Sequence, residues 1–168
     1  MNTKTRWLSP DQQQAWRAYL LGTTLLMERL DRDLRAKHDL SLPEYEILVR
    51  LSESPGRSLR MAELADLVKN SRSRITHTIA RLERDGLVTR RKYDVDGRGV
   101  LALMTEAGFA TLEKAAPDHV ESVRQAMIDV LSEDDMATIG RGFSQVVATL
   151  ETGRPDPVLS PRSATAAP

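Results

Sequence analysis

The spacing of apolar residues changes its period between residues 61 and 104. Over 61–68 and again over 75–82, apolar residues recur every three or four positions, as they do on one face of a helix. Over 88–93 and 100–104 the period falls to two, which is typical of strands. The sequence therefore predicts two short helices followed by a β-hairpin.

Short polar segments separate these elements. Lys69-Asn70-Ser71 suits a tight turn and a fresh N-cap, and Gly86 can adopt the left-handed conformation that ends a helix. A helix-turn-helix followed directly by a two-stranded ribbon is a winged helix. Its second helix enters the major groove of DNA, and its ribbon tip touches the backbone or the minor groove.

Longer helical patterns precede and follow this module. Ser9-Pro10-Asp11-Gln12 is a capping box that opens a helix of about thirty residues, and Ser41-Leu42-Pro43-Glu44 is a second box that opens the next helix. Another helix begins at Thr105 and runs toward Leu131, with a kink or a restart expected at Pro117, before a last capped helix. The predicted fold is mainly α with a small β-hairpin.

The charge of the chain is unevenly distributed. Lys and Arg number 24, as do Asp and Glu, so the net charge is zero. Residues 57–98 nevertheless hold 11 basic against 6 acidic residues, which leaves 13 against 18 in the rest of the chain. This electropositive segment coincides with the predicted winged helix, although charge alone is equally typical of a solvated surface.

Composition excludes several functional classes. The 168 residues contain no cysteine, which excludes disulfides, thiol nucleophiles and Cys-rich zinc sites. His38 and His119 lie far apart in the sequence, so we expect no metal site. The chain shows neither a membrane-spanning stretch nor a signal peptide, so we expect it to lie in the cytoplasm and not in a membrane.

The second short helix presents polar and cationic residues opposite its apolar face. Successive residues are 100° apart on a helix, so Ser73, His77, Ala80 and Arg84 face away from the apolar side, and further basic and hydroxyl residues flank them. Arg can bind the O6 and N7 acceptors of guanine, and Ser and Thr can read either base edge. The residues expected to contact DNA from this recognition helix are Ser71, Arg72, Ser73, Arg74, Thr76, His77 and Arg81.

Three features together resemble the MarR family of bacterial transcription regulators over residues 8–152. They are the run 70–88, the segment Asp96-Gly97-Arg98-Gly99 followed by Leu101-Ala102-Leu103-Met104-Thr105, and the long flanking helices. The resemblance implies that Asp96 orients Arg98, which inserts into the minor groove. Arg60 stands where the family often has a Ser or Thr cap, so it either weakens the cap or binds phosphate. The contacts expected from the wing and its flanks are Arg60, Lys69, Arg90, Asp96 and Arg98.

The domain organisation follows from the same resemblance. Residues 1–8 form an N-terminal arm and 9–152 a single MarR-like domain, with the winged helix-turn-helix at about 41–104. The helices at about 9–38 and 105–152 are expected to intertwine with those of a second copy across a two-fold axis. Residues 153–168 contain four prolines and are expected to form a disordered tail.

The predicted function is sequence-specific binding of double-stranded DNA by a homodimer on a palindromic operator, as a transcriptional regulator and repressor. A winged helix used only for protein–protein contact is the alternative, and an enzyme or a bound cofactor is not expected. The resemblance also implies a pocket for a small-molecule effector between the dimerisation helices and the winged part. Four aromatic residues either line this pocket or belong to the core: Trp16, Tyr19, Tyr45 and Phe109.

Overall fold

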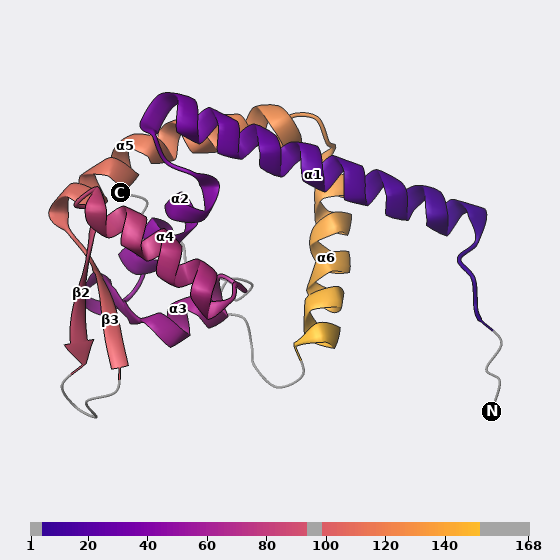
Figure 1. The fold of residues 1–168 in the computed structure, drawn as a ribbon. Helices are drawn as coiled ribbons and strands as arrows, with labels where there is room; N and C mark the ends of the chain where they lie inside the picture. Colours follow the sequence, from indigo (N-terminus) through magenta and orange to yellow (C-terminus); the bar gives the residue numbers. More distant parts are fainter. Residues whose placement is uncertain (1–4, 94–98, 152–168) are drawn as a thin grey trace.

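A computed structural model describes residues 5–93 and 99–151, and its elements appear in the predicted order (Figure 1). In chain order they are α1 (Pro10–His38), α2 (Leu42–Ser52), the short helix η1 (Pro55–Arg57), β1 (Ser58–Arg60), α3 (Met61–Leu67), α4 (Arg72–Arg84), β2 (Val88–Tyr93), β3 (Gly99–Met104), α5 (Glu106–Val123), the π-helical turn η2 (Arg124–Ile128) and α6 (Glu133–Leu150). Within these ranges no helix is both long and apolar enough to cross a membrane. The predicted tail and the wing residues 94–98 lie outside the described residues.

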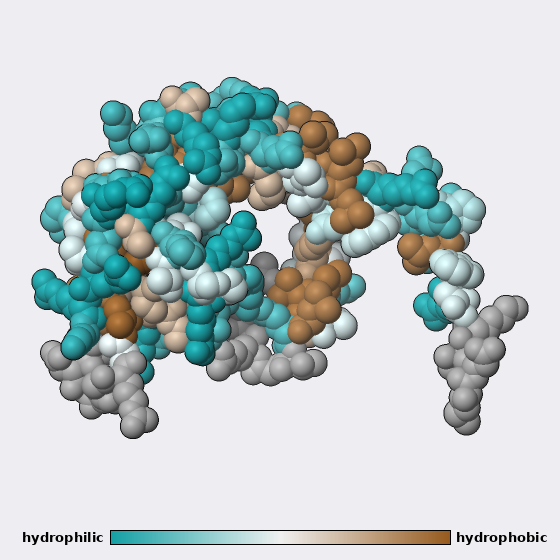
Figure 2. Space-filling view, viewed as in Figure 1, coloured by the Kyte–Doolittle hydropathy of each residue, from teal (hydrophilic) through white to brown (hydrophobic). Residues whose placement is uncertain are grey.

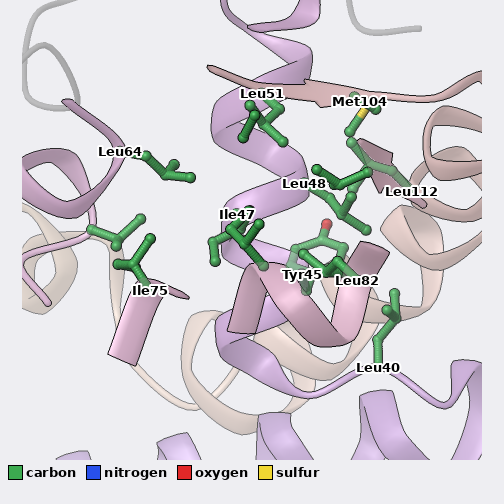
Figure 3. Packing of buried hydrophobic residues seen from close by; sticks show 14 of the residues in the cluster. Leu40, Tyr45, Ile47, Leu48, Leu51, Leu64, Ile75, Leu82, Met104 and Leu112 are labelled. Atoms are coloured by element: carbon green, nitrogen blue, oxygen red, sulfur yellow. The ribbon is translucent and has the colours of Figure 1, made fainter. Parts of the chain in front are cut away.

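The core of the winged part surrounds α2. Leu48 and Leu51 of this helix are fully buried, and Figure 3 shows them between Leu64 and Ile75 on one side and Met104 on the other. Each fully buried Leu or Ile side chain stabilises the fold by roughly 1.5–3 kcal/mol. This core fixes the orientation of α4, because its apolar face packs into the same cluster.

The sheet contains one strand more than the sequence predicted. β3 pairs antiparallel with β2 along the hairpin, and on its other edge with β1, where Leu59 lies opposite Ala102. A strand of three residues is too short to show an alternating pattern. Its pairing with β3 attaches the wing to the start of α3.

Helix α5 continues through Pro117 to Val123, so the restart considered from the sequence does not occur. The packing of α5 against α1 and α2 stabilises the helix on either side of the proline, with Leu112 and Ala115 buried before it and Ser122 after it. The chain changes from α-helix to a π-helical turn at η2, beyond the proline. Tertiary packing thus outweighs the loss of one N–H donor at this position.

The two terminal helices extend beyond the winged part. Only the C-terminal end of α1 is buried, through Leu30 and Leu34, and none of the described residues of α6 is buried. Figure 2 shows apolar patches on these helices and an open space between α6 and the winged part. The exposed apolar side chains of the two helices include Trp16, Tyr19, Leu20, Leu21, Leu25, Met27, Phe143, Val146 and Leu150.

Candidate nucleic-acid interface

Helix α4 begins at a capped turn and buries one face. The Ser71 hydroxyl oxygen accepts a hydrogen bond from the Arg74 N–H at 3.3 Å, while Ile75, Ile79 and Leu82 point into the core. The turn before the helix includes Lys69 in a left-handed conformation, with φ 51°. These constraints leave the N-terminal half of α4 facing solvent, as the sequence predicted.

The exposed half of α4 carries cationic groups that are available to a ligand. Arg72, Arg74 and His77 are exposed, and neither guanidinium has an acidic partner among the described residues. The hydroxyl of Thr76 donates to the Arg72 carbonyl at 2.8 Å, and the hydroxyl oxygens of Ser71 and Ser73 lie 3.1 Å apart. The structure therefore brings six of the seven recognition-helix residues together on one accessible surface: Ser71, Arg72, Ser73, Arg74, Thr76 and His77.

Arg81, the seventh, is already engaged within the protein. Its Nε lies 2.9 Å from Oε1 of Glu44, whose side chain is only 2 % exposed. The same carboxylate accepts hydrogen bonds from the backbone N–H and the hydroxyl of Ser41, at 2.7 and 2.6 Å. Arg81 thus contributes to the junction of α2 and α4.

Three of the residues expected to flank the recognition helix also have intramolecular partners. Arg90 donates through Nε to Glu83 at 2.8 Å, and Lys69 pairs with Glu151 at the end of α6. The Arg60 N–H donates to Glu63 at 3.2 Å, which is the half of the capping box that an arginine at the N-cap permits. Their charges still add to the positive potential of this side of the molecule.

The wing contributes two cations besides the predicted contacts. Arg91 and Lys92 of β2 are exposed and form no ion pair within 5–93 and 99–151. The run of three basic residues that begins at Arg90 could have indicated both as DNA contacts. Asp96 and Arg98 lie outside the described residues, so their predicted roles remain predictions.

The four candidate pocket residues do not meet in one place. Trp16 and Tyr19 stack on each other with ring centroids 5.6 Å apart, and Tyr19 also contacts Phe143 of α6 at 5.1 Å. Tyr45 is buried against His119 at 4.4 Å, whereas the ring of Phe109 lies 3.6 Å beneath the guanidinium carbon of Arg57. Within the described chain these residues form separate contacts.

Polar groups gather where α1 meets α5. Nζ of Lys37 donates to Asp118 at 2.7 Å, and Nε2 of His38 lies 2.9 Å from the same carboxylate. The hydrogen bonds from Lys37 and His38 lower the pKa of Asp118. Burial lowers the pKa of the neighbouring His119, and its buried Nδ1 has no hydrogen-bond partner in the described structure. His38 and His119 are thus close neighbours, but the described residues contain no cluster of three or more groups that could hold a metal ion.

The fold and this surface define a winged helix-turn-helix protein with a cationic recognition helix. The sequence profile of the MarR family matches residues 40–100. AbsC, a MarR family transcriptional regulator from Streptomyces coelicolor, is 41 % identical, with a TM-score of 0.82 over 87 % of this chain and 98 % of that chain. The chain belongs to the MarR family of transcriptional regulators.

Two further relatives support this assignment. Sco3205 of Streptomyces coelicolor, another MarR family regulator, was solved in complex with DNA and is 40 % identical, with a TM-score of 0.86 over 90 % of this chain and 95 % of that chain. The transcriptional regulator MhqR of Bacillus subtilis is 30 % identical over 100 residues, which are 60 % of this chain and 67 % of MhqR.

Proposed function

We propose that this protein is a transcriptional regulator that binds double-stranded DNA, with α4 as the recognition helix. The observation that carries the proposal is the exposed N-terminal half of α4, where Arg72 and Arg74 have no acidic partner among the described residues. Free guanidinium groups bind guanine edges or phosphates. The DNA complex of Sco3205, at 40 % identity, supports the same partner.

We further propose that it acts as a homodimer. The apolar residues of α1 and α6 remain exposed in the single chain, which is unusual for side chains as large as Trp16, Leu25 and Phe143. A second copy related by a two-fold axis would cover both helices with the same residues. Such a dimer would read a palindromic operator with half-sites about 34 Å apart.

We also propose how DNA binding affects transcription. A dimer seated on an operator blocks access to that DNA, so we propose repression, in the cytoplasm where bacterial DNA lies and without catalysis. We propose that a small-molecule effector binds where the dimer joins the winged part, because a ligand there can favour one position of the recognition helices over another. Among the candidate aromatic residues, Trp16 and Tyr19 meet Phe143 between the two terminal helices, whereas Tyr45 of α2 meets His119 of α5.

The alternative of a protein-only interaction module is less well supported. Such a module has no requirement for unpaired arginines on the recognition helix or for basic residues along β2. The similarity to a protein solved with DNA also favours nucleic acid.

Selection of bound duplexes from genomic fragments tests the proposal. We expect one palindromic sequence to be enriched, and its affinity to fall steeply with salt as bound phosphates release counterions. Fluorescence anisotropy on the selected duplex and on a scrambled one measures both properties. A protein that binds neither duplex at low salt would refute DNA binding.

A further inference from the structure

Arg74 and Arg81 lie on the same flank of α4 but differ in their surroundings. They are seven residues apart, which is two helical turns and about 10 Å along the axis. Arg74 is exposed without an acidic partner among the described residues, whereas Arg81 is paired with Glu44 and 38 % exposed. Two arginines at equivalent positions on one helix thus have different environments.

The carboxylate of Glu44 is buried, so its lost solvation must be offset by partners within the protein. Its side chain is 2 % exposed, and it is held by the Ser41 N–H, the Ser41 hydroxyl and the Arg81 guanidinium. A buried carboxylate that loses its cation is strongly destabilising, because desolvation is no longer offset. The ion pair therefore fixes the distance between the start of α2 and the C-terminal half of α4.

The same junction is attached to α1 by a second acid. Asp31 of α1 accepts the Leu42 N–H at 2.8 Å and the Arg35 Nε at 2.6 Å. Burial raises the pKa of Asp31, but its hydrogen bonds to Arg35 and Leu42 and the nearby charge of Arg81 outweigh this effect, so the pKa is lowered overall. Acidic and basic groups thus alternate from the long terminal helix to the recognition helix.

From this arrangement we propose that Arg81 is a positioning residue for DNA recognition and not a DNA contact. Together with Glu44 it holds α4 at a fixed angle to α2 and, through Asp31, to α1. In the proposed dimer, α1 would join the winged part to the apolar surface that a second copy covers, so this junction would determine how well both recognition helices fit their half-sites at once. The inference rests on the proposed DNA-binding function and specifies the residues that make it selective.

Two variants separate positioning from contact. If Arg81 bound phosphate, Glu44→Gln would release its guanidinium and leave affinity unchanged or raise it. If Arg81 positions α4, Glu44→Gln and Arg81→Met both weaken operator binding, by about tenfold, since both break the same junction. Binding to scrambled DNA then changes less than about twofold, because phosphate contacts elsewhere are retained.

Salt dependence provides a readout that a loss of stability would not reproduce. A lost phosphate contact reduces the slope of log affinity against log salt by about one per protomer. We expect this slope to be unchanged in Arg81→Met. Arg84→Met is the matched control, since Arg84 lies one turn further on, is 71 % exposed and, among the described residues, forms an ion pair only with the adjacent Asp85, at 3.4 Å. It removes the same charge without breaking the junction, so its effect on operator and scrambled DNA should be equal.

The double variant Glu44→Gln/Arg81→Met controls for folding, because it leaves no unpaired buried charge. We expect it to lose no more operator affinity than either single variant, and Arg81→Lys to restore part of the loss. Equal loss on both duplexes with a reduced salt slope in Arg81→Met, or unchanged affinity in Glu44→Gln, would overturn the inference. Failure of the wild-type protein to bind any duplex would refute the proposed function instead.

Discussion

Gly108 of α5 packs directly onto the backbone carbonyl of Leu87. A Cβ added at Gly108 would lie 2.1 Å from that carbonyl oxygen, closer than any real contact of this kind. The same carbonyl accepts hydrogen bonds from the N–H and the hydroxyl of Thr105, both at 3.1 Å. The base of the wing and the start of α5 are therefore joined by backbone contact that only glycine permits.

Gly108→Ala should consequently destabilise the protein. The backbone would have to shift, and overpacking of this kind costs about 1–3 kcal/mol, or roughly 3–10 °C in melting temperature for a chain of this size. Thermal unfolding followed by circular dichroism measures the loss. Gly140→Ala is the control, since a Cβ there meets nothing within 4 Å, and it should not lower the melting temperature. An unchanged melting temperature for Gly108→Ala would contradict the packing described.

Leu25→Glu should dissociate the proposed dimer. Leu25 of α1 is 56 % exposed in the single chain and lies within the apolar region assigned to the interface. Burying an unpaired carboxylate there would weaken association by about a hundredfold or more. Light scattering at micromolar concentration should then give the monomer mass of 18.8 kDa. Ala62→Glu, at an exposed position on α3 outside the predicted dimerisation helices, should remain dimeric, and a wild-type monomer would refute the dimer itself.

Arg74→Ala should relax base preference, whereas Arg72→Ala should weaken all duplexes alike. The two arginines lie on opposite flanks of α4, and the recognition helix directs one flank of its N-terminal half toward base edges. Loss of one bidentate base contact removes about 1–3 kcal/mol of discrimination at one base pair. Anisotropy on the operator and on single-base variants measures this change. Equal weakening of all duplexes by Arg74→Ala would reassign Arg74 to phosphate.

Arg98→Ala should lower operator affinity at least tenfold, since a dimer loses two charge-assisted contacts of about 1–3 kcal/mol each. Arg98→Lys should recover only part of this, because an ammonium is more strongly hydrated and lacks the planar fork. Asp96→Asn should fall between the wild type and Arg98→Ala, as the charge remains but its orientation is lost. Anisotropy at one salt concentration compares the four proteins, and wild-type affinity in Arg98→Ala would show that the wing does not reach DNA.

Stability should fall as the pH is lowered from about 7 to 5, because of His119. Burial lowers its pKa in the folded protein, so the unfolded chain binds the proton more readily. The stabilisation is present above the unfolded value of about 6.5 and is lost as the pH falls below it. His119→Gln should flatten this part of the pH profile of urea unfolding. The pKa of Asp118 is lowered, so this group changes the stability only below about pH 4. A pH profile that stays as steep in His119→Gln would therefore exclude His119 as the cause of the loss.

The sequence was sufficient for the elements that depend on local signals. Ser9 and Ser41 cap the helices that they were expected to cap, and the apolar face of α4 was predicted correctly from its spacing. Strand β1 was missed because its formation depends on pairing with a strand about forty residues later. The pairing of Arg81 with Glu44 could not be predicted, because helical geometry gives the direction of a side chain but does not show a buried carboxylate on another helix.

Helix α6 buries none of its described residues within its own chain. Most of the stability of a helix in a protein comes from packing of its apolar face, so α6, whose residues are not buried in the single chain, needs a further surface to pack against. If that surface belongs to another copy, the helix becomes ordered by mass action, and its stability rises with protein concentration. The number of molecules in the cell would then set how much of the protein is fully folded as well as how much DNA is occupied. Dilution would lower the folded fraction and the occupancy of DNA together.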